Sequence, residues 1–414
     1  MRIVLVTNNS GRILLENLRK IFSSLIPRDI DIEYRTVDSP LISFSSRVVL
    51  ESIVRKILEK EKPDLIVLPY DYRKRTSSHN VVVLDGTVVL EGPKHIADVI
   101  PLLMFLSENS VNSLVEKLKE CDFDLYEVLK EYKRKFESYI LRNVSSLSKI
   151  RRVFGRGCRV VVYEYYPRVL AEIIDATYRS VDECVKIASY YIESGADIVD
   201  VGCVAGDPRP WKVREIIHAI RKELGEVPVS VDTFADSELI TALESGADLL
   251  LSFTLSKLQN WHARLDDVGV VIVPESVPDS TGLITYFKSC VDAVRKLGGE
   301  PILDPLLTPP LYGFSDSIAR LVLIRREFPD ELMLIGAGNV TELVDADSVG
   351  VNMLLAVIAV EQQVDFVLTT EASVKCRGAV SELRRGIDMC YVSKILGKCP
   401  KDLSFNMLVS KRKK

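Results

Sequence analysis

The stretch ESGADIVDVG, residues 193–202, gives the first indication of the fold, because it contains a helix end and a complete buried strand. Gly195 stands where a helix ends in a left-handed residue, and the apolar run after Asp197 has the composition of a parallel strand. The phrase ESGAD returns at residues 244–248, where it precedes the apolar run LLLSFT. This repeated helix-to-strand joint predicts a series of βα units.

Outward from these two copies, the C-terminal part of the chain contains eight apolar strand candidates separated by segments with helical periodicity, such as 182–194 and 211–224. The predicted strands cover residues 169–174, 197–201, 228–232, 248–252, 268–273, 301–304, 332–336 and 365–369. Eight βα units of this length predict a (β/α)₈ TIM barrel over residues 168–400. A doubly wound sheet could also use eight strands, so the number of strands alone leaves that alternative open.

The first 150 residues have a different organisation. Strands are predicted at 2–7, 30–34 and 64–69, with helices at 13–25 and 48–61 between them, which indicates an open, Rossmann-like α/β domain. Asp85-Gly86 between two apolar runs predicts a β-hairpin, and residues 95–143 are predicted to be helical. We expect residues 151–167 to be a linker or the last strand of this first domain, and residues 401–414 to be a basic tail. The sequence assigns no role to the N-terminal domain.

Composition narrows the classes of function. The 414 residues are 47% hydrophobic and 27% charged, as in an ordinary soluble protein, and the net charge of −4 argues against a dedicated nucleic-acid binder. The eight cysteines form no CxxC pair, so we expect reduced thiols in a cytoplasmic protein. No apolar run approaches the roughly 20 residues of a membrane span. We therefore expect neither nucleic acid nor membrane as a partner.

In a (β/α)₈ barrel the active site lies at the C-terminal ends of the strands, so polar residues at these ends are candidate site residues. They are Asp175, Asp200, Gly202, Asp232, Ser252, Asp304, Asn339, Thr370 and Glu371. Asp200, Asp232 and Asp304 each end a strongly apolar strand, where a carboxylate is costly unless it is paired or hydrogen-bonded. A pterin would supply such partners, because its ring NH and 2-amino group can donate two parallel hydrogen bonds to one carboxylate.

Two other interpretations fit these residues. An aspartate after a strand often caps the next helix, and three carboxylates could instead hold Mg²⁺ or Mn²⁺. No pair of histidines has the spacing of a zinc enzyme, and we predict no protein-bound metal. The sequence also lacks a GxxxxGK[ST] phosphate loop and a GxSxG nucleophile elbow, which excludes those two motifs.

The order of the strand-end motifs resembles the pterin-binding barrel family, which includes dihydropteroate synthase and corrinoid-linked pterin methyltransferases. The resemblance is greatest to archaeal dihydropteroate synthase-related proteins, which add an N-terminal α/β domain. It rests on RVLAEIIDAT (168–177), the segment 180–202, VSVDT (229–233), ILDP (302–305) and LIGAGNV (334–340). It implies that Asp232 and Asp304 hold the pterin, that Asp200 and Gly202 shape its pocket, and that Asn339 approaches the ring.

This sequence also departs from the family pattern. Asp175-Ala176-Thr177 replaces an Asn and a Thr-Pro-Asp-Ser-Phe loop, and the strand-two loop lacks Ser-Thr-Arg-Pro, although Arg209-Pro210 follows. The strand-seven Ser-Arg-Lys and the strand-eight Arg-x-His are absent, with Thr370 and Glu371 in the latter place. Such basic residues would stabilise a leaving pyrophosphate, so these losses put the ordinary synthase reaction in doubt.

The leading hypothesis from the resemblance is a transferase that joins a dihydropterin pyrophosphate to an arylamine in folate or methanopterin-type biosynthesis. Asp175, Asp232 and Asp304 are the expected catalytic residues. Mg²⁺ would accompany the pyrophosphate, with Asp175 as a contact. The alternatives are a corrinoid-linked pterin methyltransferase, a non-catalytic pterin-binding protein, and a barrel enzyme that acts on another phosphorylated metabolite. A homodimer is a further expectation from the resemblance alone.

Overall fold

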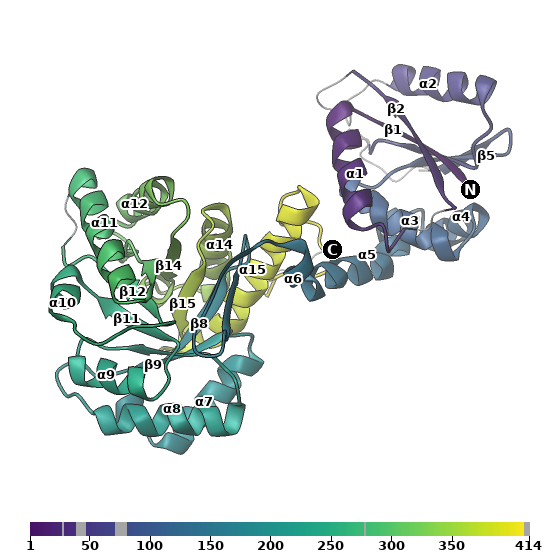
Figure 1. Ribbon diagram of the computed structural model, residues 1–414. Coiled ribbons are helices and arrows are strands. Elements are labelled where there is room, and N and C mark those ends of the chain that lie inside the picture. The colour runs from purple at the N-terminus through teal and green to yellow at the C-terminus, as the bar shows by residue number, and fades with distance from the viewer. Residues whose placement is uncertain (27–28, 39–46, 71–80, 277–278, 410–414) are drawn as a thin grey trace. The chain divides into compact units, whose positions relative to one another are not determined.

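The computed structural model describes residues 1–26, 29–38, 47–70, 81–276 and 279–409, so the basic KRKK at the end of the chain lies outside the described residues (Figure 1). The chain divides into two compact units. The first consists of Met1–Asn143 together with Val392–Phe405, and the second is built around Val144–Tyr391.

The first unit contains an open five-stranded sheet in the order β2-β1-β3-β5-β4, in which only β4 is antiparallel to its neighbour. This confirms the predicted open α/β architecture. Asp85 and Gly86 both have positive φ, 49° and 85°, as the predicted hairpin turn requires. The elements are β1 (Arg2–Thr7), α1 (Asn9–Ile21), β2 (Asp31–Thr36), α2 (Arg47–Lys60), β3 (Leu65–Leu68), β4 (Val81–Leu84), β5 (Thr87–Glu91), η2 (Ile96–Asp98), α3 (Val99–Glu108), α4 (Val111–Glu120) and α5 (Leu125–Arg142).

The C-terminal segment of the first unit is held by buried charged groups. Lys398 lies 3.3 Å from the carboxylate of Asp98, which also pairs with Lys133 at 3.0 Å. The backbone N–H of Ser404 donates to the buried carboxylate of Glu137 at 2.7 Å. Buried charges are tolerated when they are paired in this way, so the segment 392–405 completes the interior of this unit.

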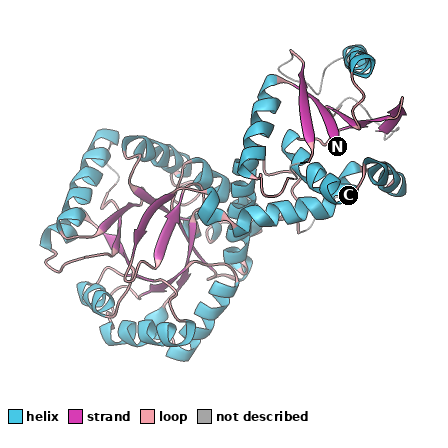
Figure 2. Cartoon of the chain, turned by 45° about the vertical axis from the view of Figure 1, so that its right-hand side comes forward, coloured by secondary structure: helices cyan, strands magenta, loops and turns pink. Residues whose placement is uncertain are grey.

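The second unit is a closed barrel of eight parallel strands ringed by helices (Figure 2). It confirms the predicted TIM-type barrel, and each predicted strand lies within about one residue of the observed one. The strands are β8 (Arg168–Ile173), β9 (Ile198–Gly202), β10 (Val229–Asp232), β11 (Leu249–Phe253), β12 (Gly269–Ile272), β13 (Glu300–Leu303), β14 (Leu332–Gly336) and β15 (Phe366–Thr370). The longer helices are α7 (Val181–Glu193), α8 (Pro210–Leu224), α9 (Asp236–Glu244), α10 (Leu255–Asn260), α11 (Ser280–Lys296), α12 (Phe314–Glu327), α14 (Ser348–Glu361) and α15 (Ala379–Leu396).

Alternation along each strand separates the helix side from the barrel interior. Val199 and Val201 of β9 pack with the surrounding helices, whereas Ile198 packs in the interior core. Because side chains alternate with a period of two, Asp200 lies on the interior side. By the same alternation, the side chains of Glu172, Asp232 and Thr370 face the barrel interior, at or near the C-terminal ends of their strands.

Residues 151–167 differ from both expectations. They are neither a linker nor a strand of the first sheet, but form the antiparallel hairpin β6 (Ile150–Phe154) and β7 (Val160–Tyr163) within the second unit, after the short helix α6 (Val144–Leu147). Phe154, Val160 and Val162 join the interior core of the barrel, and a Cβ at Gly269 would lie 2.6 Å from the Phe154 ring. The alternating apolar face of this hairpin thus closes the base of the barrel.

Three aspartates that directly precede strands fix the base of the barrel. Asp248 accepts the Val229 N–H at 3.0 Å and pairs with Arg159 and Arg221 at 3.1 and 2.6 Å. Asp197 and Asp365 accept the backbone N–H of Val169 and Met333 in the same way, each at 2.9 Å. Each aspartate therefore ties the start of its own strand to the start of a neighbour, which fixes the register of the pair.

Among the described residues, no helix combines the length and the apolar composition that crossing a membrane would require.

We predict that Asp248→Ala lowers the free energy of unfolding of the barrel by about 3–5 kcal/mol, because it removes the carboxylate that accepts from two partly buried arginines and from two backbone N–H groups, those of Arg156 and Val229. Both tryptophans of the chain, Trp211 and Trp261, lie in the second unit, so urea unfolding followed by tryptophan fluorescence reports on the barrel. Asp266→Ala, which removes an exposed partner of Arg264, is the control and should leave the midpoint unchanged. Equal midpoints for the two variants would contradict this role of Asp248.

Candidate functional site

Three acidic side chains converge inside the C-terminal mouth of the barrel. Glu172 on β8, Asp200 on β9 and Asp232 on β10 each present a carboxylate oxygen, and these oxygens all lie within 4.8 Å of one another. Strand pairing explains the convergence, since Glu172 lies opposite Asp200, and Asp232 lies opposite Gly202. A side chain at Gly202 would clash with the Glu172 carboxylate, so the glycine makes room for the cluster.

Asp200 is the most deeply buried member of this cluster and is fully inaccessible to solvent. Its Oδ1 accepts the hydroxyl of Ser230 at 2.5 Å, while its Oδ2 has no hydrogen-bond partner among the described residues. A buried polar atom without a partner is uncommon, and it marks a place where a donor or a cation would be stabilising. Burial, together with the charges of Asp232 and Glu172, raises the pKa of Asp200 well above its usual value.

A β-bulge brings Ser252 to the cluster. The pairing of β11 with β12 shifts register between Leu250 and Phe253, and Ser252 has a φ of 64°. Leu251 faces the interior and Phe253 the helices, so the bulge resets the alternation and leaves Ser252 directed inward. Its hydroxyl donates to Asp232 Oδ1 at 2.5 Å. A left-handed serine inside a strand is strained, as is common at functional sites.

Asp304 adds a fourth carboxylate at the end of β13. It is almost fully buried, and its Oδ1 accepts the Leu306 N–H at 2.8 Å. Burial, with a contribution from the charge of Asp232, raises the pKa of Asp304 to about 7. Burial and the charges of Asp232 and Asp175 likewise raise the pKa of Glu172 to about 7. Among the residues that the structure describes, none of the four carboxylates has an ion pair.

The sequence analysis did not identify Glu172. Side-chain alternation along β8 could have identified this residue. Leu170 faces the interior of the barrel, so the residue two positions later must also face it. A glutamate on the interior side of a barrel strand is unexpected in a packed core, and this makes it a candidate site residue.

The other predicted residues divide into two groups. Thr370 lies beside the cluster, with its hydroxyl 3.3 Å from the Glu172 carbonyl, and Asn339 donates from Nδ2 to the Leu307 carbonyl at 3.0 Å. Glu371 instead accepts the Val380 N–H and the Tyr190 hydroxyl, both at 3.1 Å, so it caps the start of α15. Asp175 is exposed and left-handed, with a φ of 53°, at the edge of the mouth.

Comparison with known proteins agrees with this location of the site. Residues 173–273, which include Asp200, Asp232 and Ser252, match the model of the pterin binding enzyme family. Over these residues the barrel is similar to the pterin binding enzymes. The match spans β9 to β12 and so covers three of the strands that supply the mouth residues.

Two curated proteins are similar to this chain in sequence. An uncharacterized protein of Methanocaldococcus jannaschii is 35% identical over 263 residues, which cover 60% of this chain and 49% of that protein. The dihydropteroate synthase of Clostridium beijerinckii is 27% identical over 155 residues, covering 31% of this chain and 55% of that protein. The chain thus spans about half the length of the curated relatives it matches.

Among solved structures, the dihydropteroate synthase of Yersinia pestis with a pterine-sulfa conjugate aligns with a TM-score of 0.47 and 16% identity. The alignment covers 58% of this chain and 98% of that chain.

Basic residues of the barrel lie on the rim of the mouth and are paired with carboxylates. Arg209 pairs with Asp207 at 2.8 Å and stacks on the Tyr178 ring at 3.7 Å. Lys257 forms an ion pair with Asp236, and Lys375 forms one with Asp345. Positive charge is therefore present near the mouth, but it is largely neutralised there.

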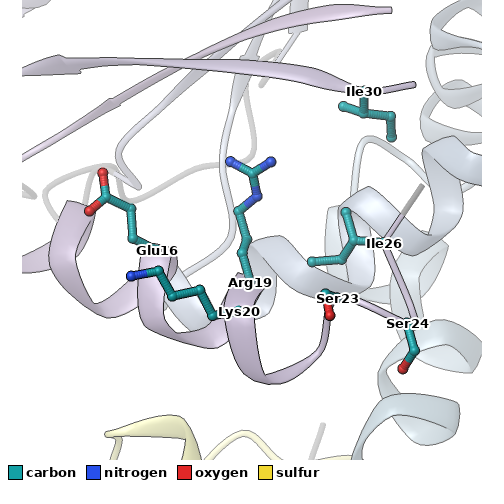
Figure 3. A pocket seen from close by; sticks show the side chains of 7 residues that line it. All are labelled: Glu16, Arg19, Lys20, Ser23, Ser24, Ile26 and Ile30. Carbon is teal, nitrogen blue, oxygen red and sulfur yellow. The ribbon is translucent and has the colours of Figure 1, made fainter. Parts of the chain in front are cut away.

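The N-terminal unit has a separate hollow of about 620 Å³, lined by Glu16, Arg19, Lys20, Ser23, Ser24, Ile26 and Ile30 (Figure 3). Figure 3 shows Arg19 and Lys20 on the last turns of α1. The C-terminal end of a helix carries partial negative charge, so these cations complement the helix dipole. This explains them without a ligand, and the barrel mouth remains the candidate site.

We predict that Asp304→Asn reduces the loss of barrel stability as the pH rises from 4 to 8. In the unfolded chain this carboxyl ionises near pH 4, but in the fold it ionises at about 7. The native state therefore holds the extra proton in that window, and stability falls as the pH rises through it, by up to about 4 kcal/mol. Asparagine keeps the acceptor for Leu306 and cannot ionise.

Thermal unfolding followed by tryptophan fluorescence at several pH values measures this difference. Asp345→Asn, at a fully exposed side chain, is the control. A constant stability difference between wild type and Asp304→Asn across the whole range would refute the interpretation.

Proposed function

We propose that the barrel binds a reduced pterin at its C-terminal mouth and acts as a dihydropteroate synthase-like transferase. The main support is that Asp200 and Asp232, two of the mouth carboxylates, lie within the segment that matches the pterin binding enzyme family. With Glu172 and Asp304 they make four acidic side chains at the mouth without ion-pair partners among the described residues, so the mouth favours a ligand rich in N–H donors. A pterin has such an edge, with a ring N–H and a 2-amino group.

In this proposal Asp232 and Asp304 accept the N–H groups of the pterin edge, and the Ser252 hydroxyl keeps the Asp232 carboxylate in place. Asn339 and Thr370 lie at the side of the pocket, and Gly202 provides the room. A carboxylate that accepts two hydrogen bonds recognises a planar donor pair with directional specificity. Ligand binding would also relieve the electrostatic repulsion within the cluster.

The proposed reaction joins a dihydropterin pyrophosphate to an arylamine. The amine lone pair attacks the methylene carbon of the pterin, the carbon–oxygen bond to pyrophosphate breaks, and the amine loses a proton. No protein nucleophile is required, so positioning of the two substrates supplies most of the rate enhancement. Arg209 is the cation best placed to receive the pyrophosphate, with Mg²⁺ bound to that leaving group and Asp175 as its contact at the rim.

Methyl transfer from a reduced pterin to a corrinoid partner is the second candidate function. The observation that favours it is the electrostatics of the mouth: the four carboxylates would repel pyrophosphate, while the rim cations Arg209, Lys257 and Lys375 are already paired. A methyl group leaves no such charge behind. Asn339, at the end of β14, stands where the resemblance gives the methyltransferases their pterin-contacting asparagine.

We further propose that the protein works in the cytoplasm, with small molecules as its partners, and forms a homodimer. A role as a pterin-binding protein without catalysis is the third candidate and is distinguished from the first two by turnover.

We predict that calorimetric titration with a reduced pterin gives saturable binding to the wild type and that Asp232→Asn weakens it about 10- to 100-fold. The amide replaces a charged acceptor whose hydrogen bonds contribute about 1.5–3 kcal/mol. Asp345→Asn, on the exposed rim, should bind like the wild type. The absence of binding by well-folded wild type, with or without Mg²⁺ and pyrophosphate, would overturn the pterin proposal.

We also predict that the protein forms a pteroate-type product from dihydropterin pyrophosphate and 4-aminobenzoate, and that Arg209→Ala lowers kcat at least about tenfold. Arg214→Ala, on the exposed side of α8, whose first residue follows Arg209, is the matched control because its partner Glu244 is also exposed. Release of pyrophosphate is the readout. Pterin binding without any product, but with methyl transfer to a free corrinoid, would favour the second candidate.

A further inference from the structure

Glu172, Asp200 and Asp232 form a compact acidic cluster, in which one carboxylate oxygen of each residue lies within 4.8 Å of the others. Glu172 and Asp200 lie on β8 and β9, and Asp200 has no access to solvent. Carboxylates at this separation repel one another strongly unless they share protons or a cation, so the structure must compensate for the cluster.

Each member of the cluster keeps an oxygen available. Asp200 Oδ1 and Asp232 Oδ1 are occupied by the hydroxyls of Ser230 and Ser252, which orient the two carboxylates. Among the described residues, Asp200 Oδ2 has no donor, although it is completely buried. An orphaned, fully buried carboxylate oxygen beside two other carboxylates is the observation that points to a ligand there, in addition to the acidic cluster itself.

We propose that Glu172, Asp200 and Asp232 form a binding site for one divalent cation that prefers oxygen ligands, such as Mg²⁺ or Ca²⁺. Two oxygens on opposite sides of one ion are separated by about 4.0–4.2 Å around Mg²⁺ and about 4.6–5.2 Å around Ca²⁺. The oxygens of the cluster lie within 4.8 Å of one another and thus meet this condition with little movement. Three carboxylates without nitrogen or sulfur ligands select hard cations over zinc or copper.

Residues around the cluster act as the outer support of this site. Ser230 and Ser252 hold one oxygen of each aspartate away from the ion, and Gly202 leaves space for the Glu172 side chain. No protein-bound metal was predicted from the sequence, because the sequence alone cannot place three carboxylates within reach of one another. The proposal does not rest on the proposed function, because neither a pterin nor a pyrophosphate takes part in it.

The test is Mn²⁺ titration of the purified full chain, stripped of metal, with the free Mn²⁺ measured by electron paramagnetic resonance. The wild type should bind one Mn²⁺, and Mg²⁺ or Ca²⁺ should displace it. Glu172→Gln and Asp200→Asn should each weaken Mn²⁺ binding at least about tenfold, since even supporting residues of metal sites have effects of that size. Asp345→Asn is the control and should bind like the wild type.

Thermal unfolding, followed by tryptophan fluorescence, separates loss of the site from loss of the fold. Without metal, Glu172→Gln should melt at or above the wild-type temperature, because the substitution removes a charge from a repulsive cluster. Added Mn²⁺ should raise the melting temperature of the wild type and leave that of Glu172→Gln unchanged. No Mn²⁺ binding by the wild type, or binding that both cluster variants retain in full, would overturn the proposal.

Discussion

The register of the eight parallel strands is the constraint on which the rest of the barrel depends. Side chains alternate between the helices and the interior, so a shift of one residue in β9 would exchange Asp200 with a valine. The base of the barrel prevents such a shift, because Asp197, Asp248 and Asp365 each accept a backbone N–H from the first or second residue of a neighbouring strand. Arginines pair with these aspartates, and the carboxylates at the base are thereby neutralised.

The buried carboxylates at the two ends of the barrel have different partners. At the base, every one of the three aspartates meets an arginine, and the result is stability. At the mouth, Glu172, Asp200, Asp232 and Asp304 meet only hydroxyls and backbone N–H groups among the described residues. The mouth is therefore destabilised by its own charge in the absence of a ligand, which is the usual relation between stability and function in a binding site.

The fold was predictable from sequence because its signals are local and repeated. Eight apolar runs, helical periodicity between them and the two ESGAD joints identified every barrel strand, and the Asp85-Gly86 turn identified the hairpin of the first sheet. The hairpin β6–β7 was not predictable, because nothing in its alternation says which core its apolar face will cover. Only the packing of Phe154 over Gly269 decides that.

The candidate site was predictable only in part, for a related reason. The sequence shows polar residues at the ends of apolar strands at Asp200, Asp232 and Asp304. Glu172 lies before the end of its strand, and only the alternation of side chains along β8 indicates that it faces the barrel interior. Glu371 follows a strand in the same manner as the others, yet its carboxylate caps α15. Ser252 reaches Asp232 because of a β-bulge. The residue types in LLLSFT do not reveal that the side-chain alternation changes within this segment. Which of these residues contact a substrate stays a prediction.

The division of the first unit between the two ends of the chain bears on the order in which this protein is made. Asp98 and Glu137 are synthesised early, whereas Lys398 and Ser404, which complete their surroundings, emerge only after the whole barrel. At about 5–20 residues per second, the roughly 250 intervening residues take on the order of 10–50 seconds to translate. During that time Asp98 has Lys133 as its partner but lacks Lys398, and Glu137 lacks Ser404.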